Sequence, residues 1–128
     1  MNTKVIILIA SFAFIILNHF FGFSGHYGYD DMEYAKLANN LNNGIIDWNN
    51  HYSHRWSILG ITAFCYSIFG INDFASALPA LLASLGTLAL VFIILRKEST
   101  FHVTLAIAFT CFSNWWIYYS DKLMPDML

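Results

Sequence analysis

The residues best suited to chemistry form a short acidic segment, residues 29–35, in which Asp30 and Asp31 are adjacent and Glu33 follows. The rest of the chain is poor in charge, since 58% of its residues are hydrophobic and 11% are charged. Carboxylates near a bilayer are costly to desolvate and tend to occur at functional sites. A carboxylate can act as a general base or bind a metal ion. Helix capping is the alternative role for Asp30 and Glu33, whereas a second adjacent acid exceeds what capping requires.

Long apolar runs predict an integral membrane protein that is entirely α-helical. Residues 5–23, 74–95 and 101–119 are each long enough to cross about 30 Å of hydrocarbon as a helix. The first run could instead be a signal peptide, but it is longer than the apolar core of such peptides and lacks a small-residue cleavage site. We therefore predict about three transmembrane helices.

The apolar segment 56–71 decides the topology because it is short for a span and typical of a helix at the membrane interface. If it crossed the membrane, Lys4 and the pair Arg96-Lys97 would lie on opposite sides, against the positive-inside rule. If it lies at the outer face, these basic residues are all cytoplasmic. We favour this second arrangement, in which the N-terminus is cytoplasmic and residues 24–73 form an extracytoplasmic loop.

Within this loop, residues 30–43 predict an amphipathic helix that lies on the outer leaflet. Asp30 is placed at its N-cap, with Glu33 three residues later as in a capping box. Gly44 suits the C-terminal end of the helix. Apolar residues recur at helical spacing and predict one stripe, which contains Tyr34, Leu37, Ala38, Leu41 and Ile45.

Basic side chains and histidines on the same predicted face could bind an anion or a metal ion. Arg55 can grip a phosphate with two hydrogen bonds, and Lys122 is a further cation near the membrane surface. Anchoring to lipid headgroups is the alternative for both. His51 and His54 have the spacing of metal ligands and could join a nearby aspartate, although solvated histidines are the ordinary interpretation. Nucleic-acid binding is not expected, because 6 basic residues are spread over both faces.

Several short motifs follow one another along essentially the whole chain. After the first apolar run come Asp30-Asp31-x-x-Tyr34-Ala35, His54-Arg55, Phe69-Gly70-Ile71-Asn72-Asp73-Phe74, Leu78-Pro79-Ala80, Tyr119-Ser120 and Pro125-Asp126. Their order and spacing resemble the N-terminal part of membrane glycosyltransferases of the GT-C fold. Within that fold, the chain is most similar to the protein mannosyltransferases that use dolichyl-phosphate mannose and to the bacterial aminoarabinose transferases.

The resemblance implies a site and a reaction. Asp30, with Asp31 beside it, would be the catalytic carboxylate, and Asp126 would be a second aspartate near it in space. The phosphate of the donor would meet basic residues of the same face: Arg55, His54 and Lys122. The implied reaction is the inverting transfer of a sugar from a polyprenyl-phosphate carrier to a glycan, lipid or protein acceptor. It would occur at the extracytoplasmic face of a bacterial plasma membrane. No cofactor is clearly implied, and a divalent metal ion is the one candidate.

Two positions depart from the pattern of this family. His54-Arg55-Trp56 stands where a lysine followed by proline is common, which leaves open whether His54 or Arg55 meets the phosphate. Ala77 replaces an arginine that is common just before the Leu-Pro pair. Because such enzymes continue through many further helices, we expect these 128 residues to be the N-terminal part of a longer enzyme and to be inactive alone.

Two other functions are compatible with the sequence. A small non-catalytic membrane subunit could use the acidic loop to bind a partner protein or an ion. A polymerase or ligase of surface polysaccharide would share the lipid-linked donor but not this placement of the acidic pair. The role of Asp30 separates the first of these from the transferase.

Overall fold

The computed structural model describes residues 3–22, 26, 28–113, 117 and 122–123, and within these residues all regular structure is helical. The elements are α1 (Thr3–Gly22), α2 (Gly28–Asn42), the 3-10 helix η1 (His51–His54), α3 (Trp56–Phe69), α4 (Asp73–Leu95) and α5 (Thr100–Cys111). The prediction of an all-α chain is therefore confirmed for the described residues.

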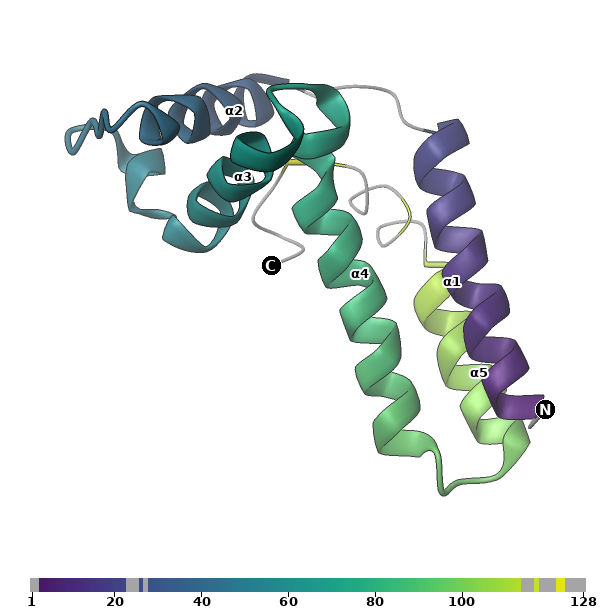
Figure 1. Ribbon diagram of the computed structural model, residues 1–128. Coiled ribbons are helices and arrows are strands. Elements are labelled where there is room, and N and C mark those ends of the chain that lie inside the picture. Colours follow the sequence, from purple (N-terminus) through teal and green to yellow (C-terminus); the bar gives the residue numbers. More distant parts are fainter. Residues whose placement is uncertain (1–2, 23–25, 27, 114–116, 118–121, 124–128) are drawn as a thin grey trace.

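The helices form two groups that run in different directions. α1, α4 and α5 lie along one another as a bundle, whereas α2 and α3 lie side by side across one end of it (Figure 1). α3 has 14 residues and lies across the bundle rather than along it (Figure 1). The interfacial position of residues 56–71 stays a prediction.

Two helices of the bundle are long and apolar enough to cross a membrane. α1 has 20 residues and α4 has 23, close to the predicted runs 5–23 and 74–95. α5 has 12 residues and is too short to span a bilayer by itself. Most of the remainder of the predicted run 101–119 lies outside the described residues.

The bundle buries one seam and leaves the rest of its apolar surface uncovered. Its buried hydrophobic cluster draws on all of its helices and consists of Ile15, Leu81, Leu88, Val103, Ile107 and Cys111. Large aliphatic side chains such as Ile9, Leu17 and Leu90 are 51%, 54% and 59% exposed. An apolar exterior on helices of this length is typical of a lipid-facing surface.

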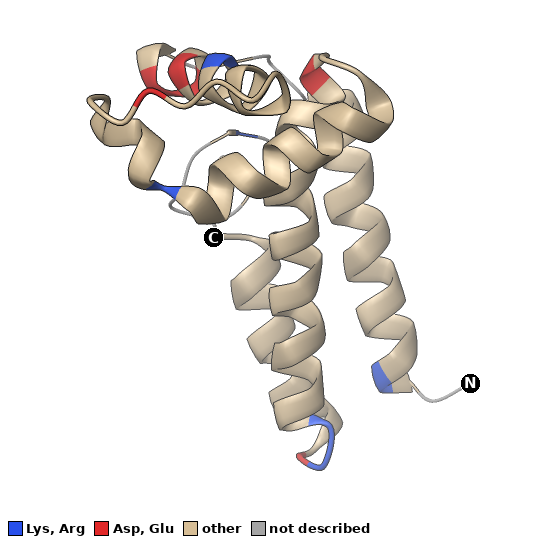
Figure 2. Cartoon of the chain, turned by 60° about the vertical axis from the view of Figure 1, so that its left-hand side comes forward, with Lys and Arg blue, Asp and Glu red and all other residues tan. Residues whose placement is uncertain are grey.

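Basic residues of the bundle gather at the end remote from α2 and α3 (Figure 2). The ammonium group of Lys4 donates a hydrogen bond of 2.9 Å to the backbone carbonyl of Arg96 and a second one to that of Glu98. The start of α1 and the turn between α4 and α5 therefore share one end, as the charge pattern predicted. The assignment of that end to the cytoplasm stays a prediction.

The apolar stripe of α2 packs against α3 instead of lying on lipid as we predicted. Tyr34, Leu37 and Ala38 are buried in one cluster with α3 and α4 residues that include Ile58, Leu59, Ala63, Cys65, Tyr66 and Ala75. Ile45 does not belong to the buried stripe, because α2 ends at Asn42 and Ile45 is 58% exposed. The periodicity of α2 was sufficient to predict a buried face but not what covers it.

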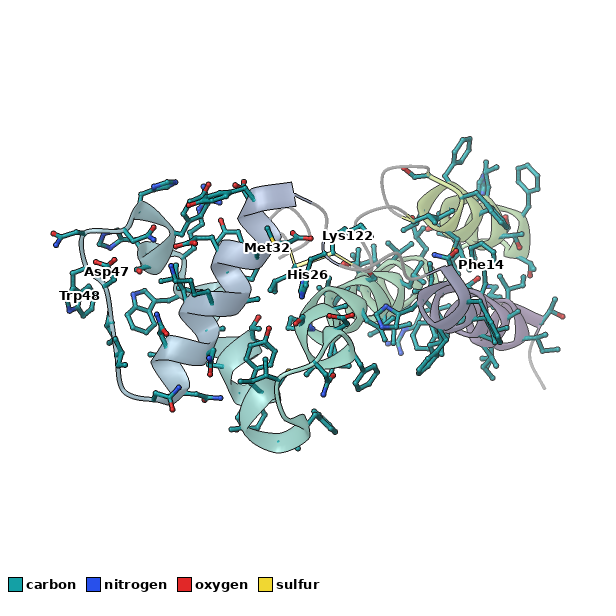
Figure 3. All side chains as sticks on the ribbon, turned by 90° about the horizontal axis from the view of Figure 1, so that it is seen from above. Phe14, His26, Met32, Asp47, Trp48 and Lys122 are labelled. Atoms are coloured by element: carbon teal, nitrogen blue, oxygen red, sulfur yellow. The ribbon has the colours of Figure 1, made fainter. Side chains whose placement is uncertain are left out.

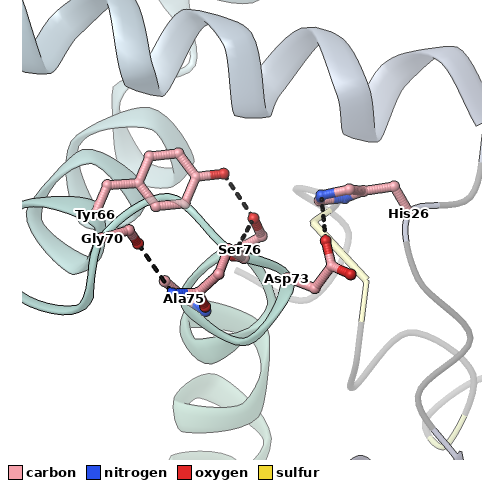
Figure 4. Close-up of polar contacts among 7 residues, drawn as sticks. His26, Tyr66, Gly70, Asp73, Ala75 and Ser76 are labelled. Carbon is pink, nitrogen blue, oxygen red and sulfur yellow. Dashed lines mark hydrogen bonds and ion pairs between the residues drawn. The ribbon is translucent and has the colours of Figure 1, made fainter.

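A tight turn joins α3 to α4 and brings α2 close by. Gly70 ends α3 with φ of 75°, and the Asn72 side chain caps α4 by accepting a hydrogen bond from the Ala75 amide at 2.9 Å. The hydroxyl groups of Tyr66 and Ser76 lie 2.6 Å apart across the turn (Figure 4). His26, just before α2, is paired with the carboxylate of Asp73 at 3.6 Å.

Candidate functional site

Asp30 lies in the first turn of α2 and contacts η1. Because α2 begins at Gly28, Asp30 is the third residue of the helix, so the prediction that it forms the N-cap was wrong. Its Oδ1 atom accepts a hydrogen bond of 2.6 Å from the hydroxyl of Tyr52. The loop between α2 and η1 folds back to bring these two residues together.

The Asp30 carboxylate raises the pKa of Tyr52 to about 12. The hydrogen bond is the largest cause, since it stabilises the neutral phenol, and desolvation and the negative charge of Asp30 act in the same direction. Like an ordinary tyrosine, Tyr52 is protonated at neutral pH, and its hydroxyl donates to Asp30.

Arg55 lies between η1 and α3, with its guanidinium group beside two tyrosine rings. The guanidinium carbon is 5.6 Å from the ring centroid of Tyr34 and 5.6 Å from that of Tyr52, within the range of cation–π contacts. A guanidinium nitrogen also donates a hydrogen bond to the Tyr34 hydroxyl. The two rings meet edge to face at 5.1 Å and orient the planar group, while Arg55 as a whole stays exposed.

Asn50 ties η1 to α2. Its side-chain oxygen accepts a hydrogen bond of 3.0 Å from the backbone amide of Tyr52, which caps η1. Its side-chain nitrogen donates a hydrogen bond of 2.8 Å to Oε1 of Glu33. Glu33 is 9% exposed and also pairs with Lys36 at 3.8 Å. Glu33 therefore holds the η1 loop in place instead of completing the capping box that we predicted.

The adjacent acids Asp30 and Asp31 do not face the same surroundings. Successive side chains on a helix point about 100° apart, and Asp31 lies on the face of α2 that buries Tyr34 and Ala38. Asp31 is 0% exposed, whereas Asp30 is partly exposed. The arrangement leaves Asp30 as the acid that a ligand at the surface could reach.

The chain returns to this region after α5. Leu123 is buried in the cluster formed by α2, α3 and α4, and the preceding Lys122 is 2% exposed. In the view from above, Lys122 lies among residues near the start of α2, close to the labels of His26 and Met32 (Figure 3). Lys122 is therefore not displayed on the surface, where a phosphate could reach it. Asp126, the second predicted catalytic aspartate, lies outside the described residues.

The histidines of the loop contact aromatic rings. His54 is exposed, and its ring centroid is 6.4 Å from that of Trp48. His51 lies against Tyr52 with ring centroids 3.9 Å apart. Among the residues that the structure describes, no group of three histidine, cysteine, aspartate or glutamate side chains could hold a metal ion. The metal site therefore stays a prediction.

The sequence did not indicate the partners of Asp30 and Arg55. Tyr34 was assigned to an apolar stripe, and Tyr52 and Asn50 were given no role. The sequence signal that could have indicated these partners was the concentration of aromatic and amide side chains beside His51 and His54. Spacing alone could not pair these residues with α2, because their contacts depend on the path of the loop.

No family model matches this chain. No curated protein and no solved structure matches it either. The resemblance to GT-C glycosyltransferases therefore rests on the sequence motifs. The described residues themselves show an all-helical chain with two helices of membrane-spanning length. They also place an acidic side chain, Asp30, and a basic side chain, Arg55, against the same tyrosine, Tyr52.

Proposed function

We propose that the chain contributes to a membrane glycosyltransferase, one that moves a sugar from a polyprenyl-phosphate carrier to an acceptor at the extracytoplasmic membrane face. The observation that carries this proposal is the convergence of Asp30 and Arg55 on Tyr52. The tyrosine hydroxyl donates to the Asp30 carboxylate at 2.6 Å, and the Arg55 guanidinium lies over the same ring at 5.6 Å. A base for the acceptor and a cation for the phosphate thus lie within one small site.

Asp30 would act as the general base. Its carboxylate takes the proton of an acceptor hydroxyl while the acceptor oxygen forms a bond to the anomeric carbon of the sugar. The bond from that carbon to the phosphate oxygen breaks, and polyprenyl phosphate leaves with the electron pair. Attack from the face opposite the leaving group inverts the anomeric configuration. Tyr52 orients the carboxylate through Oδ1, which leaves Oδ2 as the atom proposed to accept the proton.

Arg55 would stabilise the departing phosphate. A guanidinium group can form two parallel hydrogen bonds to phosphate oxygens, and the two tyrosine rings limit its rotation. Arg55 is exposed, whereas Lys122 is 2% exposed. We therefore assign the phosphate contact to Arg55 rather than to Lys122.

The experiment uses membranes that contain the product of the intact gene in its host. Polyprenyl-phosphate-linked mannose, glucose and aminoarabinose are supplied as donors, and the release of polyprenyl phosphate is measured. We expect Asp30→Asn to lower the rate by a factor of about 10² to 10⁴, as for the loss of a general base. Arg55→Lys keeps the charge but loses the planar fork, so we expect a smaller decrease.

Asp47→Asn is the matched control, because Asp47 is an exposed acid of the same loop whose carboxylate accepts a hydrogen bond from the Asn49 amide. It should leave the rate unchanged. Full activity of Asp30→Asn would contradict the assigned role of Asp30. Absence of release from all three donors by the unmodified protein would contradict this reaction. Loss of a co-purifying partner protein in Asp30→Asn would then favour the non-catalytic subunit.

A further inference from the structure

α3 has two faces with different surroundings. One face is buried against α2 and α4 and includes Ile58, Leu59, Thr62, Ala63, Cys65 and Tyr66. On the opposite face, Ile61, Phe64 and Ile68 are 42%, 64% and 56% exposed, and their spacing aligns them in one stripe. α3 contains no charged residue. An exposed stripe on such a helix marks a surface that another apolar phase covers.

A second exposed apolar group lies in the loop at the far end of α2 and α3. Ile45, Ile46 and Trp48 are 58%, 38% and 58% exposed. Trp56, at the start of α3, is 45% exposed, and its ring centroid is 5.9 Å from that of Trp48. Figure 3 shows Trp48 at the end of this helix pair that is remote from the bundle. We call these four residues the tryptophan tip.

Aromatic rings connect the stripe of α3 to the exterior of the bundle. Phe74 of α4 lies 6.1 Å from Phe20 of α1 and 5.9 Å from Phe69 of α3, measured between ring centroids. These rings are 38%, 61% and 50% exposed, respectively. The apolar exterior of α1 and α4 therefore continues directly onto α3. Since α1 and α4 have the length of membrane spans, the same lipid phase is in position to cover both surfaces.

α2 presents a different surface on the other side of the pair. The exposed side chains of α2 change in character along the helix. Tyr29 and Met32, near its start, are 68% and 58% exposed, whereas from Lys36 onward the exposed side chains of α2 and of the turn after it are polar, namely Lys36, Asn42 and Asn43. The side chain of Lys36 is 67% exposed. A charged and amide-rich surface of this kind favours water over lipid.

We propose that α2 and α3 form a two-layer platform on the bilayer, in which phospholipid covers the α3 stripe and the tryptophan tip while α2 faces water. Tryptophan is enriched at the headgroup level of membranes, which suits both Trp48 and Trp56. The platform places lipid under α3 and not under α2, in contrast to the position predicted from the sequence of α2 alone. It depends on the membrane location of the bundle and is independent of any catalytic role.

Site-directed fluorescence in vesicles tests this arrangement. Single cysteines are introduced as Phe64→Cys, Trp48→Cys and Asn42→Cys and labelled with an environment-sensitive dye. The native Cys65 and Cys111 are 4% and 2% exposed, so the unsubstituted chain measures background labelling. The protein is reconstituted in phosphatidylethanolamine and phosphatidylglycerol. Quenching is compared between a lipid that carries a shallow spin label and iodide present on both sides of the membrane.

We expect the spin-labelled lipid to quench the dye at positions 64 and 48 at least about twofold more strongly than at position 42. Iodide should give the reverse order. Equal iodide quenching at positions 64 and 42 would overturn the proposal, because the stripe would then face water. Protection of position 64 from both quenchers would also overturn it, because a protein surface would then cover the stripe. Stronger lipid quenching at position 42 would show that α2 is the lipid-facing layer.

Discussion

Asp30 and Tyr52 are joined by a hydrogen bond of 2.6 Å that affects both side chains. The carboxylate raises the pKa of the phenol, and the phenol fixes the direction of one carboxylate oxygen. A residue chosen by its type, Asp30, thereby acquires a defined geometry from a tyrosine that had no predicted role. Arg55 gains its orientation from the same ring and from Tyr34.

The first prediction concerns the titration of Tyr52. We expect Asp30→Asn to lower the pKa of Tyr52 from about 12 toward the ordinary 10.0, because an amide accepts the hydrogen bond without a negative charge. The chain has 7 tyrosines. The difference in tyrosinate absorbance between each protein and its Tyr52→Phe counterpart therefore isolates the titration of Tyr52 from that of the other tyrosines. Asp47→Asn should leave the titration unchanged. An identical curve for Asp30→Asn would show that Asp30 does not control this pKa.

The raised pKa also predicts how stability depends on pH. The pKa of Tyr52 is higher in the folded chain than in the unfolded chain, so the stabilisation is complete below pH 10 and declines as the pH rises towards about 12. The difference in melting temperature between the unsubstituted chain and Tyr52→Phe should therefore shrink over this interval. Thermal unfolding in detergent at several pH values measures it. A difference that stays constant from pH 10 to 12 would contradict the assignment.

At the scale of the elements, η1 depends on one side chain for its position. Asn50 caps η1 and donates to Glu33, so Asn50→Ala removes both contacts. We expect a loss of about 1–3 kcal/mol in the free energy of unfolding, since a cap is lost and a buried acceptor is left without its donor. Asn49→Ala is the neighbouring control, because Asn49 is exposed and its recorded contact uses the backbone amide. Equal effects of the two substitutions would show that Asn50 does not hold η1.

The turn between α3 and α4 requires a glycine at position 70. Gly70 has φ of 75° and ψ of 173°, a conformation that side-chain-bearing residues rarely adopt. Gly70→Ala should therefore cost about 1–3 kcal/mol of unfolding free energy. Gly60→Ala is the matched control within α3, where an added Cβ would meet nothing within 4 Å and helix propensity favours alanine. A Gly70→Ala protein as stable as Gly60→Ala would contradict this account.

At the scale of the whole molecule, the two ends of the bundle differ in their charged residues. Lys4, Arg96, Lys97 and Glu98 share one end, and the acids of α2 lie at the other together with Lys36 and Arg55 (Figure 2). The positive-inside rule predicts that the end with Lys4, Arg96 and Lys97 is cytoplasmic. We therefore expect an impermeant maleimide to label Asn43→Cys in intact cells and to label Lys97→Cys only after permeabilisation. The unsubstituted chain, whose cysteines are buried, is the control. The reverse labelling pattern would place the platform in the cytoplasm.

The sequence by itself determined the helices and the grouping of Lys4 with Arg96. Apolar runs such as 5–23 and 74–95 predict helices locally, since length and periodicity depend on neighbouring residues alone. The tertiary structure decided which residues meet. Burial of Asp31, the pairing of Asp30 with Tyr52, and the cover of α2 by α3 all depend on how the chain folds back through η1. Such contacts join residues about twenty positions apart and leave no periodic pattern in the sequence, so packing alone selects them.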